Sequence, residues 1–270
     1  MARTGHVPHL ELCGKPDPPR HPVHDPRLMT AATSTLDAVP DTPFALFDLE
    51  GAWSAARPEP RPRLPHETRV VADAGDRVAW LRARSRGVTA TDAAKLATRE
   101  SVRTAAYEKL HGSRTSFGGS RFTDHGRARE PVIAEWAHRT HGIDASSLLF
   151  HAEFERRHLA TPDGLRVAPN GALELCEIKT TSKPWRGIPR GYLRQVWWQQ
   201  YVLGAERTLV VWEQHDDFVP VADEPRCRWV DRDDDQIAIL VGLADELLLA
   251  ILPTAPVEDP RAVYRPGALA

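Results

Sequence analysis

The sequence predicts an α/β fold, in which a mixed central β-sheet is flanked by helices and preceded by an all-helical region at about 69 to 145. Residues 160–179 read as two short strands joined by a tight turn. Asn170-Gly171 marks the turn, because both residues can adopt positive φ at low cost. An amphipathic helix at 190–203 and an apolar strand at 208–213 follow, an order that favours parallel pairing with the second hairpin strand.

The other elements follow from hydrophobic periodicity. Helical patterns precede the sheet in four segments: 67–84, from an N-cap at Thr89 or Thr91 onward, 101–110 and 126–140. Three consecutive antiparallel strands are expected next, at about 148–156, 162–168 and 172–180. Residues 237–252 form a strongly apolar helix that should cover the sheet.

Composition separates a folded domain from two flanking segments. Residues 1–68 hold about half of the 23 prolines and read as a Pro-rich, disordered arm. Residues 69–252 carry the periodic patterns of one domain, and residues 253–270 form an irregular tail. No apolar run approaches the length of a membrane span, so no membrane association is expected. Three scattered cysteines form no disulfide framework, and a reducing cytoplasmic location follows as the default.

The charge distribution leaves the class of partner open. The formal net charge of −2 argues weakly against constitutive nucleic-acid binding. Arginines are nevertheless concentrated between residues 77 and 139, and acidic residues gather at 231–235. This asymmetry suits an enzyme that guides a polyanion along one face, and an ordinary mixed surface explains it equally well.

The predicted hairpin carries a chemically distinctive group. Side chains alternate along a strand, so Glu177 and Lys179 point to one side and Ile178 points into the core. Folding at the turn brings Asp163 back beside Glu177. Two carboxylates make a hard oxygen site for Mg²⁺ or Mn²⁺, and a neighbouring lysine can orient a water and offset developing charge. The alternative is an exposed acid–base pair at a strand end.

These residues resemble a known motif. Pro162-Asp163 followed by Glu177-Ile178-Lys179 resembles the signature of the PD-(D/E)XK nucleases. Three further segments, in the same order, resemble those of the phage lambda exonuclease and YqaJ-type viral recombinase family: 80–92, 126–131 and 192–199. The resemblance covers about residues 78 to 215 and implies a restriction-endonuclease-like core.

The resemblance implies a role for each matching residue. The metal would be bound by Asp163, Glu177, the Ile178 carbonyl oxygen and Glu130, while Lys179 positions or deprotonates the nucleophile. Substrate contacts would come from Arg84 and Thr91 at the 5′-phosphate, and from Tyr192, Gln195 and Gln199, with Gln195 the better candidate of the two glutamines. Three alternatives stay open: Thr91 as a plain helix cap, Glu130 as compensation of the helix dipole, and the 192–199 stripe as a solvated face.

The implied function is a Mg²⁺-dependent 5′-to-3′ exonuclease on linear duplex DNA, acting in phage or prophage recombination. A single-strand annealing protein and a homo-oligomeric ring are the implied partners. Two other classes remain: a restriction- or repair-type endonuclease with the same catalytic residues, and a non-catalytic DNA-binding module.

Overall fold

The computed structural model describes residues 64–112 and 120–252, and these form the α/β architecture that the sequence predicts. The expected Pro-rich arm and tail fall almost wholly outside the described residues. Within the described part no helix is long and apolar enough to cross a membrane.

The elements follow one another from a short 3₁₀ helix to a long C-terminal helix. In chain order they are η1 (Pro65–Arg69), β1 (Val70–Asp73), α1 (Arg77–Arg86), β2 (Val88–Thr89), α2 (Ala90–Lys95), α3 (Arg99–His111), α4 (Arg121–His141), β3 (Asp144–Ala145), β4 (Leu148–His151), β5 (His158–Ala160), β6 (Gly164–Val167), β7 (Leu173–Thr181), α5 (Arg190–Leu203), β8 (Arg207–Asp216), β9 (Val219–Pro220), β10 (Arg226–Asp231) and α6 (Asp234–Ile251).

The larger sheet has the strand order β10-β8-β7-β6-β3, with β9 paired to β8. The predicted hairpin is confirmed, because β6 and β7 are antiparallel. The predicted parallel pairing is also confirmed, with Glu177 of β7 opposite Val210 of β8. The turn differs from the prediction: Gly171 has φ +85° but Asn170 does not have positive φ. The loop has three residues, and the Gly171 N–H bonds to the Ala168 carbonyl oxygen at 2.8 Å.

The prediction of three consecutive antiparallel strands is wrong. Strand β4 does not pair with β6; it belongs to a second sheet of order β1-β4-β5-β2. The chain turns back after His151, and the Ala152 N–H bonds to the His158 carbonyl oxygen at 2.9 Å. Phe154, inside the strand expected over 148–156, lies in this connection and is 89% exposed.

The N-terminal region is predominantly helical but not all-helical. Val70 and Val71 form a strand where a helix was expected over 67–84, and α1 begins only after Asp76 caps it through the Ala79 N–H. Two β-branched residues side by side favour an extended backbone. The second sheet therefore draws two of its strands, β1 and β2, from this region.

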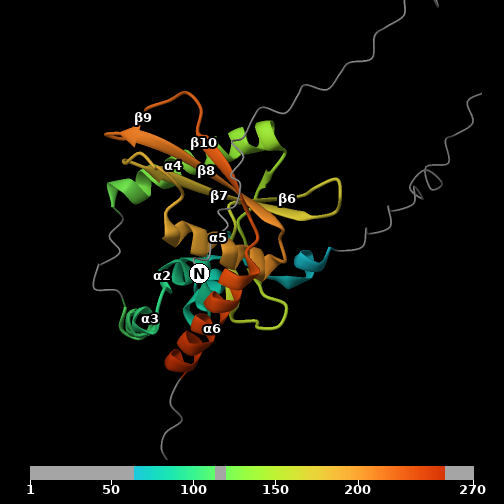
Figure 1. Cartoon of the computed structure of the whole chain (residues 1–270), viewed down its shortest axis with the longest axis vertical. Helices are drawn as coiled ribbons and strands as arrows, with labels where there is room; N and C mark the ends of the chain where they lie inside the picture. Colours follow the sequence, from blue (N-terminus) through green and yellow to red (C-terminus); the bar gives the residue numbers. More distant parts are fainter. Residues whose placement is uncertain (1–63, 113–119, 253–270) are drawn as a thin grey trace, which may run out of the picture. The chain divides into compact units, whose positions relative to one another are not determined.

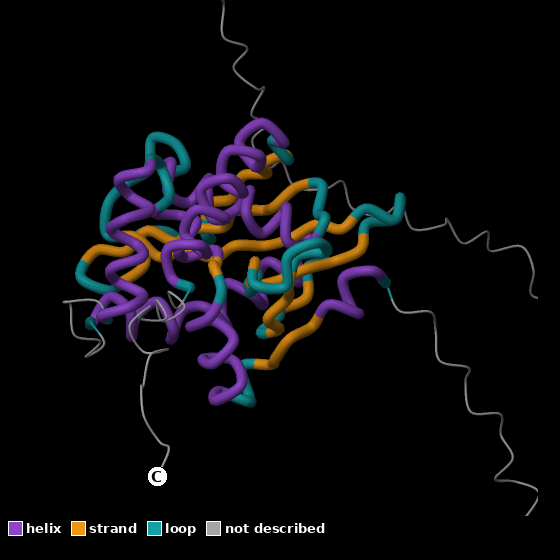
Figure 2. Tube along the Cα trace, turned by 90° about the horizontal axis from the view of Figure 1, so that it is seen from below, coloured by secondary structure: helices purple, strands orange, loops and turns teal. Residues whose placement is uncertain are grey.

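Helices cover the larger sheet on both faces (Figures 1 and 2). On one face, Ile133 of α4 packs with Ile178 of β7. On the other, Val196 of α5 packs with Val210 of β8. Helix α6 packs mainly against α3 and α5 rather than on the sheet as predicted. Strand β7 is consequently held between α4 and α5, and residues from all three elements can meet at its end.

Candidate active site

The hairpin brings Asp163, Glu177 and Lys179 together, as the sequence predicts. The Asp163 N–H bonds to the Cys176 carbonyl oxygen at 3.1 Å, and its carboxylate accepts the Ile178 N–H at 2.7 Å. Lys179 forms an ion pair with Glu177 on the same side of β7, while Ile178 is 7% exposed in the core. The alternative of an exposed acid–base pair does not hold, because Glu177 is only 1% exposed.

Gly164 allows this approach. A Cβ atom there would lie 2.9 Å from the Asp144 carbonyl oxygen and 3.2 Å from the Cys176 Cβ, which is too close for a larger residue. The sequence Pro-Asp-Gly therefore places the carboxylate of Asp163 where β6 is squeezed between β3 and β7.

Helix α5 completes the surroundings of Glu177. Gln199 donates through Nε2 to one Glu177 oxygen at 2.6 Å, and Gln195 donates to the other. The ring of Tyr192 lies 5.2 Å from the Lys179 ammonium. The stripe 192–199 thus faces the site rather than solvent. Gln199, ranked below Gln195 on the sequence, is fully buried.

The electrostatics show an excess of negative charge. Burial raises the pKa of Asp163 well above its usual range, and the Glu177 charge adds to this effect. Burial alone would lower the pKa of Lys179, but the charges of Glu177 and Asp163 raise it above its ordinary value. Lys179 is therefore protonated at neutral pH.

Glu130 lies in the middle of α4 rather than at its start. The helix was expected to begin at residue 126, yet Ser120 caps it through the Thr123 N–H at 3.2 Å, so Glu130 and Pro131 are interior. Dipole compensation is therefore excluded for Glu130. Loss of hydration raises the pKa of Glu130, and the nearby charge of Glu177 raises it further, so Glu130 lies within electrostatic reach of the hairpin carboxylates.

The donor set fits a hard divalent cation. Glu130, Asp163 and Glu177 lie within electrostatic reach of one another and of Lys179, and the pKa values of Glu130 and Asp163 are raised. A divalent cation would neutralise that excess with the oxygen ligands it prefers. Among residues 64–112 and 120–252 no three His, Cys, Asp or Glu side chains converge enough to hold an ion unaided, so backbone, water or substrate oxygens would have to share in its coordination.

Arg84 and Thr91 lie on α1 and α2. Thr89, not Thr91, is the N-cap of α2, in a capping box with Asp92, so the side chain of Thr91 is exposed and not used as a cap. The Arg84 guanidinium lies 4.1 Å from the centre of the Trp80 ring. Burial lowers the pKa of Arg84, partly offset by Asp92. No contact in the described part of the chain joins these two residues to Lys179.

Sequence reasoning missed two features of the site. The hydroxyl of Thr161, two residues before Asp163, is buried with no hydrogen-bond partner among the described residues. A bidentate ion pair also joins Arg129 of α4 to Glu213 of β8, at 2.8 and 2.7 Å. No local pattern links residues so far apart in sequence.

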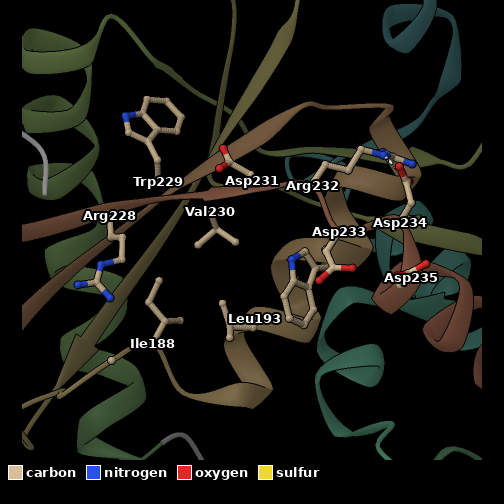
Figure 3. A pocket seen from close by; sticks show the side chains of 12 residues that line it. Ile188, Leu193, Arg228, Trp229, Val230, Asp231, Arg232, Asp233, Asp234 and Asp235 are labelled. Carbon is tan, nitrogen blue, oxygen red and sulfur yellow. Dashed lines mark hydrogen bonds and ion pairs between the residues drawn. The ribbon is translucent and has the colours of Figure 1, made fainter. Parts of the chain in front are cut away.

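A cavity of about 590 Å³ lies on the side of α5 away from Glu177. Its lining combines apolar side chains, among them Ile188, Leu193 and Val230, with charged ones: Asp231, the acidic run 233–235, Arg228 and Arg232 (Figure 3).

The fold and the arrangement of Asp163, Glu177 and Lys179 resemble those of the PD-(D/E)XK nucleases. Residues 79–206 match the model of the YqaJ-like viral recombinase domain. This match agrees with the resemblance seen in the motifs.

Solved structures of similar fold include LHK-Exo, an alkaline exonuclease from Laribacter hongkongensis. Its complex with dAMP is 22% identical, with a TM-score of 0.49, covering 64% of this chain and 91% of that chain; a second structure of LHK-Exo is 21% identical, with a TM-score of 0.47 and the same coverage. A phage-related exonuclease from Haemophilus somnus is 14% identical, with a TM-score of 0.45, covering 57% of this chain and 80% of that chain. No curated protein matches this chain.

Proposed function

We propose that this chain is a Mg²⁺-dependent DNA exonuclease that degrades linear duplex DNA from the 5′ end, with Mn²⁺ as a possible substitute. The observation that carries the proposal is the buried cluster of Asp163, Glu177 and Lys179, held by two glutamine donors of α5. Such a cluster is costly to bury without a chemical use. The match of residues 79–206 to a viral recombinase domain supports DNA as the substrate.

The residues divide the work as follows. Asp163, Glu177, Glu130 and the Ile178 carbonyl oxygen hold the cation, which when bound polarises the phosphodiester and acidifies water. The protonated Lys179 orients the attacking water and offsets charge that develops on the phosphate. Gln195 and Gln199 hold the Glu177 carboxylate in a fixed orientation. Tyr192 packs beside the ammonium and limits its movement.

The 5′-end preference rests on Arg84 and Thr91. A guanidinium that burial has partly dehydrated is a strong partner for an anion, and the Thr91 hydroxyl is not used as a helix cap. We assign both to the terminal phosphate. Work in phage or prophage recombination, beside a single-strand annealing protein and as a ring around DNA, is part of the same proposal and follows from the family.

Digestion of linear duplex DNA with Mg²⁺ tests the proposal. Substrates carry a 5′-phosphate or a 5′-hydroxyl, a closed circle is the control, and Lys179→Ala is assayed in parallel. Mononucleotides released from phosphorylated linear DNA, and lost in the variant, are the expected result. Cutting of the circle would identify an endonuclease instead. No cleavage with either Mg²⁺ or Mn²⁺ would leave a DNA-binding module as the better account.

A further inference from the structure

A separate cavity, of about 430 Å³, opens where β7 ends and α5 begins. Its volume falls in the range of small-molecule sites. The lining comes from the β7 end, the connecting loop and the start of α5: Thr181, Ser182, Lys183, Trp185, Pro189, Gly191 and Tyr192. It is distinct from the larger cavity described above, because the two share no lining residue.

This cavity adjoins the catalytic lysine. Thr181 lies two residues after Lys179, on the same side of β7, which is about 6.6 Å along the strand. Tyr192 lines the cavity, and its ring lies 5.2 Å from the Lys179 ammonium. A group bound in the cavity would therefore lie next to Lys179.

The cavity has an aromatic wall. The ring of Trp185 stacks on that of Trp212, with centroids 5.2 Å apart and planes 25° apart. The centroid of the Tyr192 ring also lies 5.2 Å from that of Trp185. Trp212 is paired with Lys179 in the register of β7 and β8, two strands that run side by side in Figure 1. Trp185 is only half-buried, so part of its side chain is open to solvent at the cavity.

The rim of the cavity is basic. Lys183 lines it, and Arg186 and Arg190 are exposed in the segment that follows. None of these three side chains takes part in an ion pair with another described residue. Hydrogen bonds between the Thr181 hydroxyl and the Lys183 backbone, at 2.9 and 3.1 Å, fix the start of the loop. Aromatic faces next to unpaired cations are the combination that binds single nucleic-acid strands.

We propose that this cavity binds a nucleobase at the DNA end being cut, stacked on Trp185, while Lys183 contacts an adjoining phosphate. The inference rests on the proposed function for its substrate, and it adds a base-binding site that the catalytic residues do not supply. Stacking accepts every base because each has a π-face, so the site gives position without sequence preference.

Isothermal titration of the full chain, without divalent cation, tests binding separately from cleavage. The probes are 2′-deoxyguanosine 5′-monophosphate and 2-deoxyribose 5-phosphate, which lacks the base. The wild type should bind the nucleotide more tightly. Trp185→Ala should weaken nucleotide binding by about 5-fold to about 150-fold, the range expected for one stacked base. The sugar phosphate should bind the variant as it binds the wild type.

Two further variants separate stacking from a structural role of Trp185. Trp185→Phe keeps a π-face and should retain most of the affinity, while Phe154→Ala removes an 89% exposed ring in another loop and should change nothing. Equal affinity of the wild type for both probes, or no binding of either, would overturn the proposal even if Trp185→Ala did not fold. An equal loss in Trp185→Ala for both probes would also overturn it.

Cleavage gives an independent measurement. An abasic residue at the 5′ end should lower kcat/KM for the wild type, and Trp185→Ala should cut normal and abasic ends at similar rates. If the wild type cuts both ends equally well, the nucleobase site is refuted and the nuclease stands. If the wild type cuts neither, the proposed function fails, and the titration still decides whether the cavity binds a base.

Discussion

The ion pair between Arg129 and Glu213 joins the middle of α4 to β8, next to the residues assigned to catalysis. Both guanidinium contacts are short, at 2.8 and 2.7 Å, and the hydrogen bond to Glu213 raises the pKa of Arg129. Pro131, two residues on, cannot donate a helical hydrogen bond, so α4 is weakest near this point. We expect the pair to fix the position of Glu130 above β7.

The two partners differ in exposure, and this sets the expected energies. The side chain of Glu213 is 7% exposed and that of Arg129 is 29% exposed. Arg129→Met leaves a buried carboxylate without its partner and should cost about 3 kcal/mol of unfolding free energy. Glu213→Gln leaves an arginine that reaches water and should cost about 1 kcal/mol. The double variant should cost about 2 kcal/mol, which gives a coupling energy of about 2 kcal/mol.

Urea unfolding of the four proteins measures this cycle. Arg139→Met is the matched control, because Arg139 lies on the same helix and its pair with Glu135 is long, at 4.0 Å, and exposed; it should change stability by less than about 1 kcal/mol. Additive energies in the cycle would refute the reasoning. In the cleavage assay, Arg129→Met should lower kcat by up to about 100-fold if Glu130 shifts by an ångström, and the control should not.

Three other changes test the fold. Burial lowers the pKa of His158, so as pH falls the unfolded chain binds this proton before the folded chain does. Stability should therefore fall as pH falls below about 6.5, and the melting temperature of His158→Gln should depend less on pH over that range. Gly171→Ala forces a non-glycine residue to φ +85° and should cost about 1 kcal/mol in urea unfolding; an unchanged midpoint would show that the turn rearranges. Gly164→Ala places a Cβ 2.9 Å from a backbone oxygen and should cost about 1 to 3 kcal/mol, measured in the same way.

The hairpin and its residues were predictable because their causes are local. Alternation along β7 places the side chains of Glu177 and Ile178 on opposite faces of the sheet. The glycine at the turn sets which residues of β6 pair with those of β7. The same reasoning brought Asp163 to the site, since register follows once the turn is fixed. The actual loop is one residue longer than a two-residue turn, yet Gly171 still takes the positive φ that the loop requires.

The wrong predictions concern features that depend on long-range packing. Residues 148–156 alternate well enough for one strand, but the chain turns back after His151 and uses only the first part in the second sheet. Helix α4 begins five residues before the predicted start at 126 and keeps Pro131 in its interior, where a proline is costly; the cap at Ser120 and the burial of Ile133 and Ala137 offset that cost. Glutamines spaced along one helix face give the same sequence pattern whether the face is solvated or surrounds a buried carboxylate. The sequence therefore could not decide whether Gln195 or Gln199 is the better site candidate.

The protonation of Lys179 decides between its two suggested roles. Its ammonium is paired with Glu177 and lies near the negative charge of Asp163, and both charges raise its pKa. A group that keeps its proton at neutral pH cannot accept one from water, whereas it can donate hydrogen bonds to water and to a phosphate oxygen. The geometry therefore favours Lys179 as the residue that orients the nucleophile and offsets charge. Lys179→Gln retains an N–H donor that can orient water but lacks the positive charge. We therefore expect this variant to cleave DNA more slowly than the wild type in the digestion assay.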